Sequence, residues 1–158
     1  MQNTHKTALR AILLGGFCAG LADFLFASIK ATLNGNSPLR PWKGVASGLL
    51  GRQAARDGGV EMAVLGVVMH FFICFVAAAL LYLLLSRVTW LPRQWLVVAV
   101  LYGIAFLAIM NYVILPLSAI GVSIYKPETL HINAFWHIVL VGLPTAWFVT
   151  RGLRSAPR

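Results

Sequence analysis

The sequence predicts an all-α polytopic membrane protein, a bundle of four transmembrane helices with a short interfacial helix in the first outer loop. Of its 158 residues, 59% are hydrophobic and only 11% are charged, whereas soluble domains carry about 25% charged residues. The mean hydropathy is +0.82. Apolar runs long enough to cross a bilayer, about 20 residues each, recur along the chain. Its length fits one integral membrane domain, residues 1–158.

The expected spans cover residues 11–30, 62–86, 94–116 and 132–150. Only Asp23 interrupts the first span, which is too long for the apolar core of a signal peptide, about 7–15 residues, and is therefore expected to be retained. The third span ends near Pro116, and the stretch LSAIGVSIY is expected to leave the membrane as a loop or short outer segment. In the fourth span, Gly142 and Pro144 predict a kink.

The loop between the first two spans contains a second helical pattern, within SPLRPWKGVASGLLGRQAARDGG. Val45, Leu49 and Leu50 can share one face of a short helix that lies on the outer surface. Gly48 and Gly51 weaken such a helix, so a plain surface connector is the alternative interpretation.

Charges near the span ends set the expected orientation. With both termini inside, the inner side carries Lys6, Arg10, Arg87, Arg93, Arg151, Arg154 and Arg158, and the outer side carries Lys30, Arg40, Lys43, Arg52, Arg56 and Lys126. The acids Asp57, Glu61 and Glu128 lie outside, and the inner segments contain none. We therefore predict cytoplasmic termini.

The remaining composition excludes several classes of protein. The net charge of +9 arises from short basic runs between apolar stretches, which is typical of membrane flanks rather than of a nucleic-acid groove. Cys18 and Cys74 both lie inside apolar runs, so neither a disulfide framework nor a C-x-x-C motif is expected. The five tryptophans fall near the predicted membrane surfaces and form an aromatic belt: Trp90, Trp95 and Trp147 inside, Trp42 and Trp136 outside.

Four polar residues interrupt the spans: Asp23, His70, Asn111 and His137. Counted from the outer end of each helix, at 1.5 Å per residue, they lie within about one turn of the same depth, in the outer half of the membrane. Polar groups in a membrane usually face the bundle interior and pair with one another. We therefore expect Asp23 to face His70, His137 or both, in a pocket that binds or relays a small ligand, ion or proton. Structural hydrogen bonding between helices is the alternative.

Small residues predict close helix packing around this pocket. Gly16 and Gly20 have the GxxxG spacing that lets two helices approach closely, and Gly66 lies one turn before His70. A weak internal repeat is also present, because Gly15 precedes Asp23 and Gly103 precedes Asn111 by the same interval. Parallel repeats of this kind occur in transporters, although chance explains two shared positions equally well.

Several short strings resemble a widespread family of small, uncharacterised bacterial inner-membrane proteins with four predicted transmembrane helices. They are ASGLLG (46–51), GG (58–59), the spacing from Gly66 to His70, LYG (101–103), MNYVILPLSA (110–119) and VGLP (141–144) with His137. The resemblance covers nearly the whole chain and implies a bacterial inner membrane. It supplies no catalytic residue.

Three alternatives to a non-enzymatic ligand or proton pocket stay open. His70 and His137 are the candidate ligands for a b-type haem or a metal, since bis-histidine ligation needs two helices at similar depth. A lipid-modifying enzyme would use Asp23, a histidine and the outer arginines on a phosphate head group, but no recognised catalytic spacing is present. An accessory subunit would bind a membrane partner or a second copy of the chain.

Overall fold

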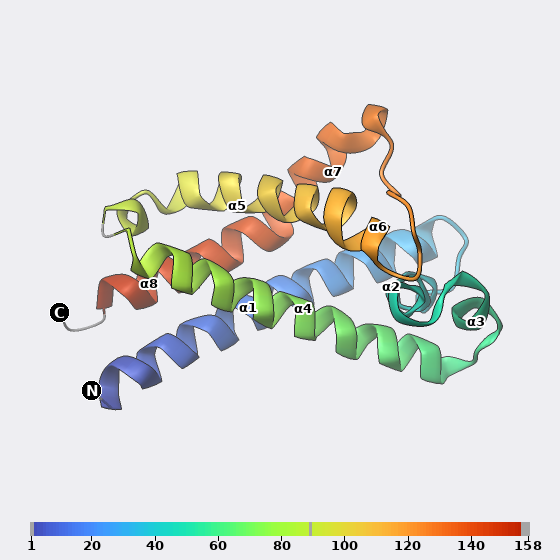
Figure 1. The fold of residues 1–158 in the computed structure, drawn as a ribbon, viewed down its shortest axis with the longest axis horizontal. Helices are drawn as coiled ribbons and strands as arrows, with labels where there is room; N and C mark the ends of the chain where they lie inside the picture. The colour runs from blue at the N-terminus through green and yellow to red at the C-terminus, as the bar shows by residue number, and fades with distance from the viewer. Residues whose placement is uncertain (1, 89, 156–158) are drawn as a thin grey trace.

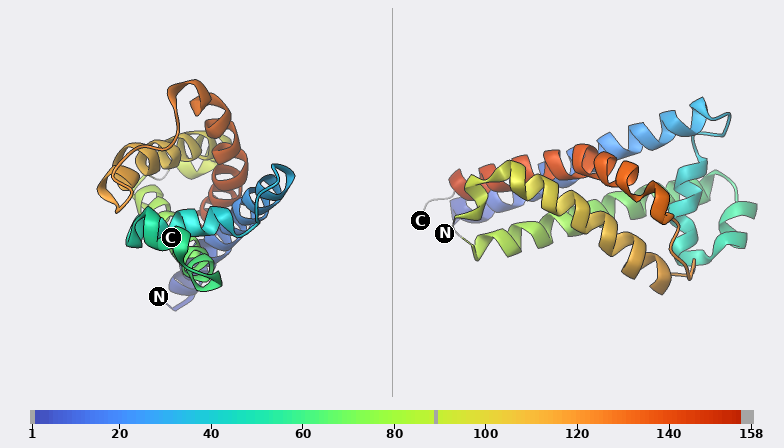
Figure 2. Two further views of the ribbon diagram at one scale, coloured as in Figure 1. Left: turned by 90° about the vertical axis from the view of Figure 1, so that its right-hand side faces the viewer. Right: turned by 90° about the horizontal axis from the view of Figure 1, so that it is seen from above.

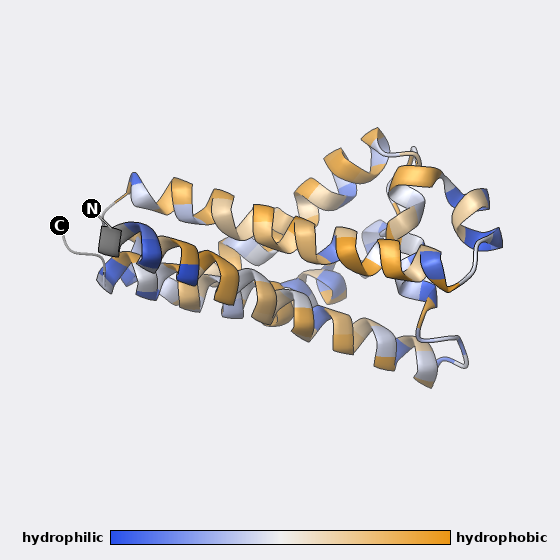
Figure 3. Ribbon diagram, turned by 90° about the horizontal axis from the view of Figure 1, so that it is seen from below, coloured by the Kyte–Doolittle hydropathy of each residue, from blue (hydrophilic) through white to orange (hydrophobic). Residues whose placement is uncertain are grey.

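The computed structural model describes residues 2–88 and 90–155, and within them every regular element is helical (Figure 1). Four helices are long and apolar enough to cross a membrane: His5–Leu33, Val60–Ser86, Trp95–Leu117 and Pro127–Ser155. Polar residues gather toward the two ends of these helices (Figure 3). The predicted all-α four-helix bundle is confirmed.

The elements follow one another along the chain as an up-and-down bundle with a helical insertion. The α-helices are α1 (Gln2–Leu33), α2 (Arg40–Leu50), α3 (Arg52–Asp57), α4 (Val60–Ser86), α5 (Trp95–Ile109), α6 (Leu115–Leu117), α7 (Leu130–His137) and α8 (Leu143–Ser155). Short 3-10 turns occur at η1 (Leu91–Arg93) and η3 (Pro127–Thr129), and π-helical turns at η2 (Met110–Ile114) and η4 (Ile138–Gly142). Both termini lie at one end, the terminal end, and α2, α3 and the loop 118–126 lie at the other, the loop end (Figure 1).

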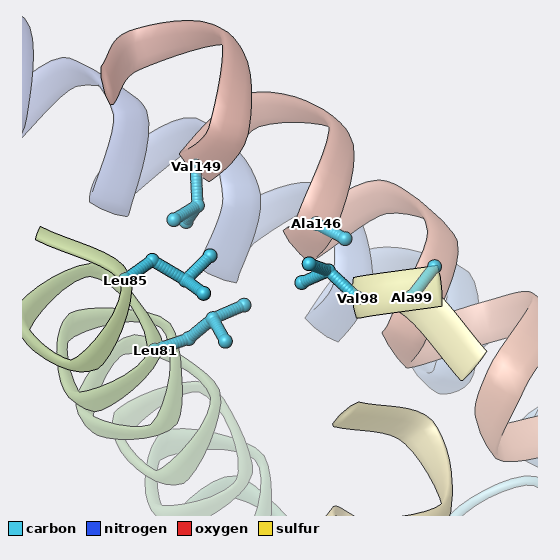
Figure 4. Close-up of a cluster of buried hydrophobic side chains, with 6 residues drawn as sticks. All are labelled: Leu81, Leu85, Val98, Ala99, Ala146 and Val149. Carbon is cyan, nitrogen blue, oxygen red and sulfur yellow. The ribbon is translucent and has the colours of Figure 1, made fainter. Parts of the chain in front are cut away.

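The bundle is most tightly packed toward the terminal end. There α4, α5 and α8 meet in a cluster of buried side chains, Leu81, Leu85, Val98, Ala99, Ala146 and Val149 (Figure 4). Small residues bring the backbones together: a Cβ on Gly142 would lie 2.3 Å from the carbonyl oxygen of Ala99, and a Cβ on Gly152 would lie 2.5 Å from the Cβ of Ala11. Larger residues at these glycines would separate the helices.

Gly16 and Gly20 lie on the face of α1 that packs against α4. A Cβ on Gly16 would lie 3.2 Å from the carbonyl oxygen of Cys74, and one on Gly20 would lie 2.8 Å from the ring of Phe71. The GxxxG spacing thus lets α1 approach the part of α4 that carries His70.

Two π-helical turns interrupt the third and fourth spans in the same way. In each span, five π-helical residues are followed by a leucine and a proline. The proline is Pro116 in the third span and Pro144 in the fourth. The amide of Leu115 bonds the carbonyl of Met110, and the amide of Leu143 bonds the carbonyl of Ile138, each five residues back. A proline lacks an amide hydrogen and crowds the carbonyl four residues before it. The wider π turn accommodates both effects, and in the fourth span it lies at Gly142 and just before Pro144, where the sequence predicted a kink.

The insertion at the loop end is helical, and it packs on the bundle through a face other than the one that carries Leu49 and Leu50. Trp42, Ala46 and Ser47 form the buried face of α2, while Leu49 is 60% exposed and Leu50 is 44% exposed. The reason is Gly66 on α4, which admits the backbone of Trp42 and so turns that side of α2 toward the bundle. Gly51, with φ +83°, separates α2 from α3.

Candidate functional site

A cavity of about 1320 Å³ opens at the loop end of the bundle. Its lining residues come from all four spans, from α2 and α3, and from the loop 118–126. Seen from the loop end, α2 crosses in front of the spans (Figure 2). We call it the central cavity. Asp23, His70 and His137 all line it.

Asp23 on α1 and His70 on α4 face each other across the helix interface. Nδ1 of His70 lies 4.0 Å from Oδ2 of Asp23. The His70 side chain is 12% exposed and the Asp23 side chain is 32% exposed. This separation is that of an ion pair rather than of a direct hydrogen bond. Within the part of the chain that the structure describes, no other carboxylate lies within 4.0 Å of a basic side chain.

The second nitrogen of His70 determines what the pair can do chemically. Nε2 lies 3.0 Å from the carbonyl oxygen of Gly20. A carbonyl only accepts, so Nε2 carries the hydrogen in this bond. Nδ1 is then the nitrogen that faces the carboxylate of Asp23, across the 4.0 Å separation.

Aromatic rings hold the imidazole of His70 in place. The Trp42 ring lies 5.0 Å from it, and the Phe71 ring lies 5.4 Å from it. Trp42 is itself fixed, because its Nε1 donates to Oγ of Ser28 at 3.0 Å and its ring stacks on Phe24 at 4.6 Å. The sequence assigned Trp42 only to an aromatic belt. The direct contact of its backbone with Gly66 across the interface is a tertiary feature that no local pattern reveals.

His137 also lines the central cavity, at the end of α7. Its Nδ1 lies 2.8 Å from the carbonyl oxygen of Asn133, one turn earlier in the same helix. The rings of Phe106 and Tyr125 lie 6.1 Å and 6.0 Å from the imidazole. His137 therefore belongs to the same cavity as Asp23 and His70, while Asp23 makes its close contact with His70.

Asn111 has a different role from the one expected. Its side chain is completely buried and does not line the cavity. Its Oδ1 accepts hydrogen bonds from the backbone amides of Ile124 and Tyr125, at 3.1 and 3.0 Å. Its carbonyl also accepts a bond from the hydroxyl of Ser123 at 2.9 Å. Asn111 thus holds the loop 118–126, so the proposed internal repeat does not extend to the roles of Asp23 and Asn111.

The same loop supplies Tyr125, a cavity residue that the sequence analysis missed. Burial raises the pKa of the Tyr125 phenol, and the negative charge of Asp23 raises it further. The loop is also tied to α2, because the amide of Ala119 donates to the carbonyl oxygen of Gly48 at 2.9 Å. The aromatic residue at the end of LSAIGVSIY was the one available signal that this segment returns to the bundle.

Basic side chains surround the mouth of the central cavity. Five of them are among its lining residues: Lys30, Arg40, Lys43, Arg52 and Arg56. Asp23 is the one carboxylate in that lining.

The residues described by the structure include no cluster of three or more His, Cys, Asp or Glu side chains able to hold a metal ion. For a haem ligated by His70 and His137, His70 offers only Nδ1, since Nε2 bonds Gly20. Cys18 and Cys74 are free thiols. This Nδ1 atom of His70 faces the carboxylate of Asp23.

No protein-family model, curated protein or solved structure matches this chain. The interpretation of the site consequently comes from its own geometry.

Proposed function

We propose that this chain is a membrane protein that binds a small ligand or ion in the central cavity and uses the Asp23–His70 pair to hold or relay a proton there. One observation carries the proposal. The pair joins two different spans and also lines a cavity large enough for a ligand. A pair that served only to join helices would not need access to such a space.

Trp42 provides a built-in reporter for testing the proposal, because its ring lies 5.0 Å from that of His70. Protonated imidazole quenches indole fluorescence more strongly than neutral imidazole does. In a variant whose other four tryptophans are replaced by phenylalanine, we expect the fluorescence in mild detergent to change with pH in a single transition. His70→Gln should abolish this transition, and Asp23→Asn should move its midpoint.

Two exposed residues outside the cavity lining provide matched controls. His131→Gln and Asp57→Asn make the same chemical changes away from the pair and should leave the transition in place. In proteoliposomes loaded with a pH-sensitive dye, Asp23→Asn should also change the rate of proton entry. If Asp23→Asn alters thermal stability and nothing else, the pair is a structural contact and the proposal is wrong.

We further propose that the protein resides in the bacterial inner membrane with both termini in the cytoplasm. The basic, acid-free segments at the terminal end support this orientation, and the resemblance noted above supports the compartment. A green fluorescent protein fused to the C-terminus should fluoresce, and alkaline phosphatase fused there should be inactive. The opposite pattern would reverse the orientation.

The bilayer is the expected environment, and a second copy or a membrane complex is the expected kind of protein partner. Light scattering from the protein in detergent distinguishes a monomer from a dimer, and a stoichiometric co-purifying chain would indicate an accessory subunit. A visible spectrum of the same sample tests the haem alternative, which requires a Soret band.

A further inference from the structure

The charges around the central cavity are segregated by sign. Its lining holds five basic side chains and one carboxylate, Asp23, which gives a formal excess of four positive charges. The acids nearest in sequence to the basic residues, Asp57 and Glu61, are both absent from the lining. On α3, Arg52 and Arg56 line the cavity, whereas Gln53 and Asp57 bond each other, Nε2 to Oδ2, at 2.6 Å. The α3 helix therefore directs its positive charges to the cavity and bonds its one acid elsewhere.

None of these five cations forms an ion pair with a carboxylate, although Lys43 lies near enough to Glu61 for their charges to interact. In the described parts of the chain, residues 2–88 and 90–155, no Lys or Arg lies within 4.0 Å of an Asp or Glu oxygen. Lys43 donates from Nζ to the carbonyl oxygen of Gly58 at 2.6 Å, and Arg40 donates to Oδ1 of Asn36, so both have neutral partners. Unpaired guanidinium and ammonium groups around one opening form a site for an anion, and guanidinium groups match the oxygens of a phosphate particularly well.

Another part of the cavity lining is apolar and has a different requirement. Phe26, Ile73, Phe106, Ile114, Ile124 and Trp136 line it from α1, α4, α5, η2, the loop and α7. A free phosphate would bind at the mouth and leave this wall unused. A neutral amphiphile would cover the wall and leave the cations without a counter-charge.

We propose that the central cavity binds an anionic amphiphile of the phospholipid class, with its phosphate among Arg40, Lys43, Arg52 and Arg56 and its hydrocarbon chain along the apolar wall. This inference rests on the proposed function, because it names the ligand class of the same cavity. The chain of the amphiphile would lie beside the Asp23–His70 pair, and the cations would set the preference for a negative head group.

The test uses full-length protein in a neutral detergent and three probes, with binding measured by calorimetry. The probes are dihexanoyl-phosphatidylglycerol below its micelle concentration, dihexanoyl-phosphatidylcholine and inorganic phosphate. We expect the glycerol lipid to bind most tightly. Equal binding of the choline lipid would overturn the role of the cations, equal binding of inorganic phosphate would overturn the role of the apolar wall, and no binding of any probe would overturn the proposal.

Charge-neutralised variants locate the site. The double variant Arg52→Gln, Arg56→Gln removes two exposed cations from the mouth and should weaken binding of the glycerol lipid about tenfold. The matched double variant Arg87→Gln, Arg93→Gln changes two exposed arginines at the terminal end, and Lys126→Gln removes a cation at the loop end outside the cavity lining. Both should bind as the wild type does. Equal weakening in all three variants would mean non-specific attraction and would overturn the proposal.

The pH dependence of Trp42 fluorescence separates this inference from the proposed function. If the transition depends on His70 and Asp23 but no lipid binds, only the ligand class is wrong. If the lipid binds and the transition is absent, the proton-sharing pair is wrong while the amphiphile site stands.

Discussion

Gly66 on α4 is the point at which α2 makes its closest approach to the bundle, and one added methyl group there tests how the cavity is built. A Cβ at this position would lie 1.8 Å from the carbonyl oxygen of Trp42 and 2.6 Å from its carbonyl carbon. Ordinary contact begins at 3.4 Å. Gly66→Ala therefore requires α2 to move away from α4 by more than about 1 Å, because both clashing groups belong to rigid helices.

The expected cost follows from what this movement disturbs. Trp42 is 2% exposed, its Nε1 bonds Ser28, and its ring lies against Phe24 and His70. Forcing extra atoms into a packed interface typically costs about 1–3 kcal/mol. We expect the upper part of that range, about 3 kcal/mol, since neither backbone can rotate out of the way as a side chain would.

The assay is unfolding by sodium dodecyl sulfate in mixed micelles, followed by tryptophan fluorescence. Gly44→Ala is the matched control, because Gly44 lies in α2 and a Cβ there would meet nothing within 4 Å. We expect Gly44→Ala to stabilise the helix by up to about 1 kcal/mol. If the free energies of unfolding of the two variants differ by less than about 0.5 kcal/mol, the inferred contact between α2 and α4 is wrong.

Two further predictions concern the loop 118–126. Asn111→Ala leaves two loop amides without their acceptor, which should lower the free energy of unfolding by about 1–3 kcal/mol and speed hydrogen exchange at residues 123–125. The control variant Asn34→Ala, at an exposed position, should do neither. Unchanged exchange in the Asn111 variant would exclude the anchoring role. Because burial and the charge of Asp23 raise the pKa of Tyr125, the unfolded chain loses this proton at lower pH than the folded chain does. The free energy of unfolding should accordingly fall as pH rises above about 10. In unfolding measurements over a series of pH values, Tyr125→Phe should reduce this fall, and Tyr112→Phe, at an exposed position, should not. If the free energy of unfolding falls equally steeply with pH in the two variants, the assignment to Tyr125 is wrong.

The sequence predicted that Asp23 faces His70, His137 or both because depth in a membrane is a local property. Each residue advances its helix by a fixed rise, so counting from a charged end places the three residues at the same level. The cost of an unpaired charge in the membrane then indicates that Asp23 faces a histidine. The structure places His70 4.0 Å from Asp23. The same counting placed Asn111 at that level, but depth does not say which way a side chain points, and Asn111 faces the returning loop.

The direction in which each helix faces was beyond the sequence for a physical reason. A helix in water marks its buried face with an apolar stripe, but a helix in lipid is apolar on every side. On α4, Phe72 is 66% exposed and Leu81 is 6% exposed, and both are apolar. The inner face of each span is therefore recorded in the positions of small residues and in helix contacts, not in hydropathy. On α2, likewise, apolar residues lie on both faces, since Leu49 and Leu50 are exposed and Trp42 is buried.

By itself the sequence determined the four-helix class and four stretches long and apolar enough to cross a membrane, since both depend on residues close together along the chain. Only the tertiary structure decided that α2 packs on Gly66, that Tyr125 returns to the bundle and that five cations surround one cavity. Those features depend on helix rotation and on contacts between distant segments. Such contacts are set by backbone approach at glycines and by buried hydrogen bonds, which leave no periodic signal in the sequence.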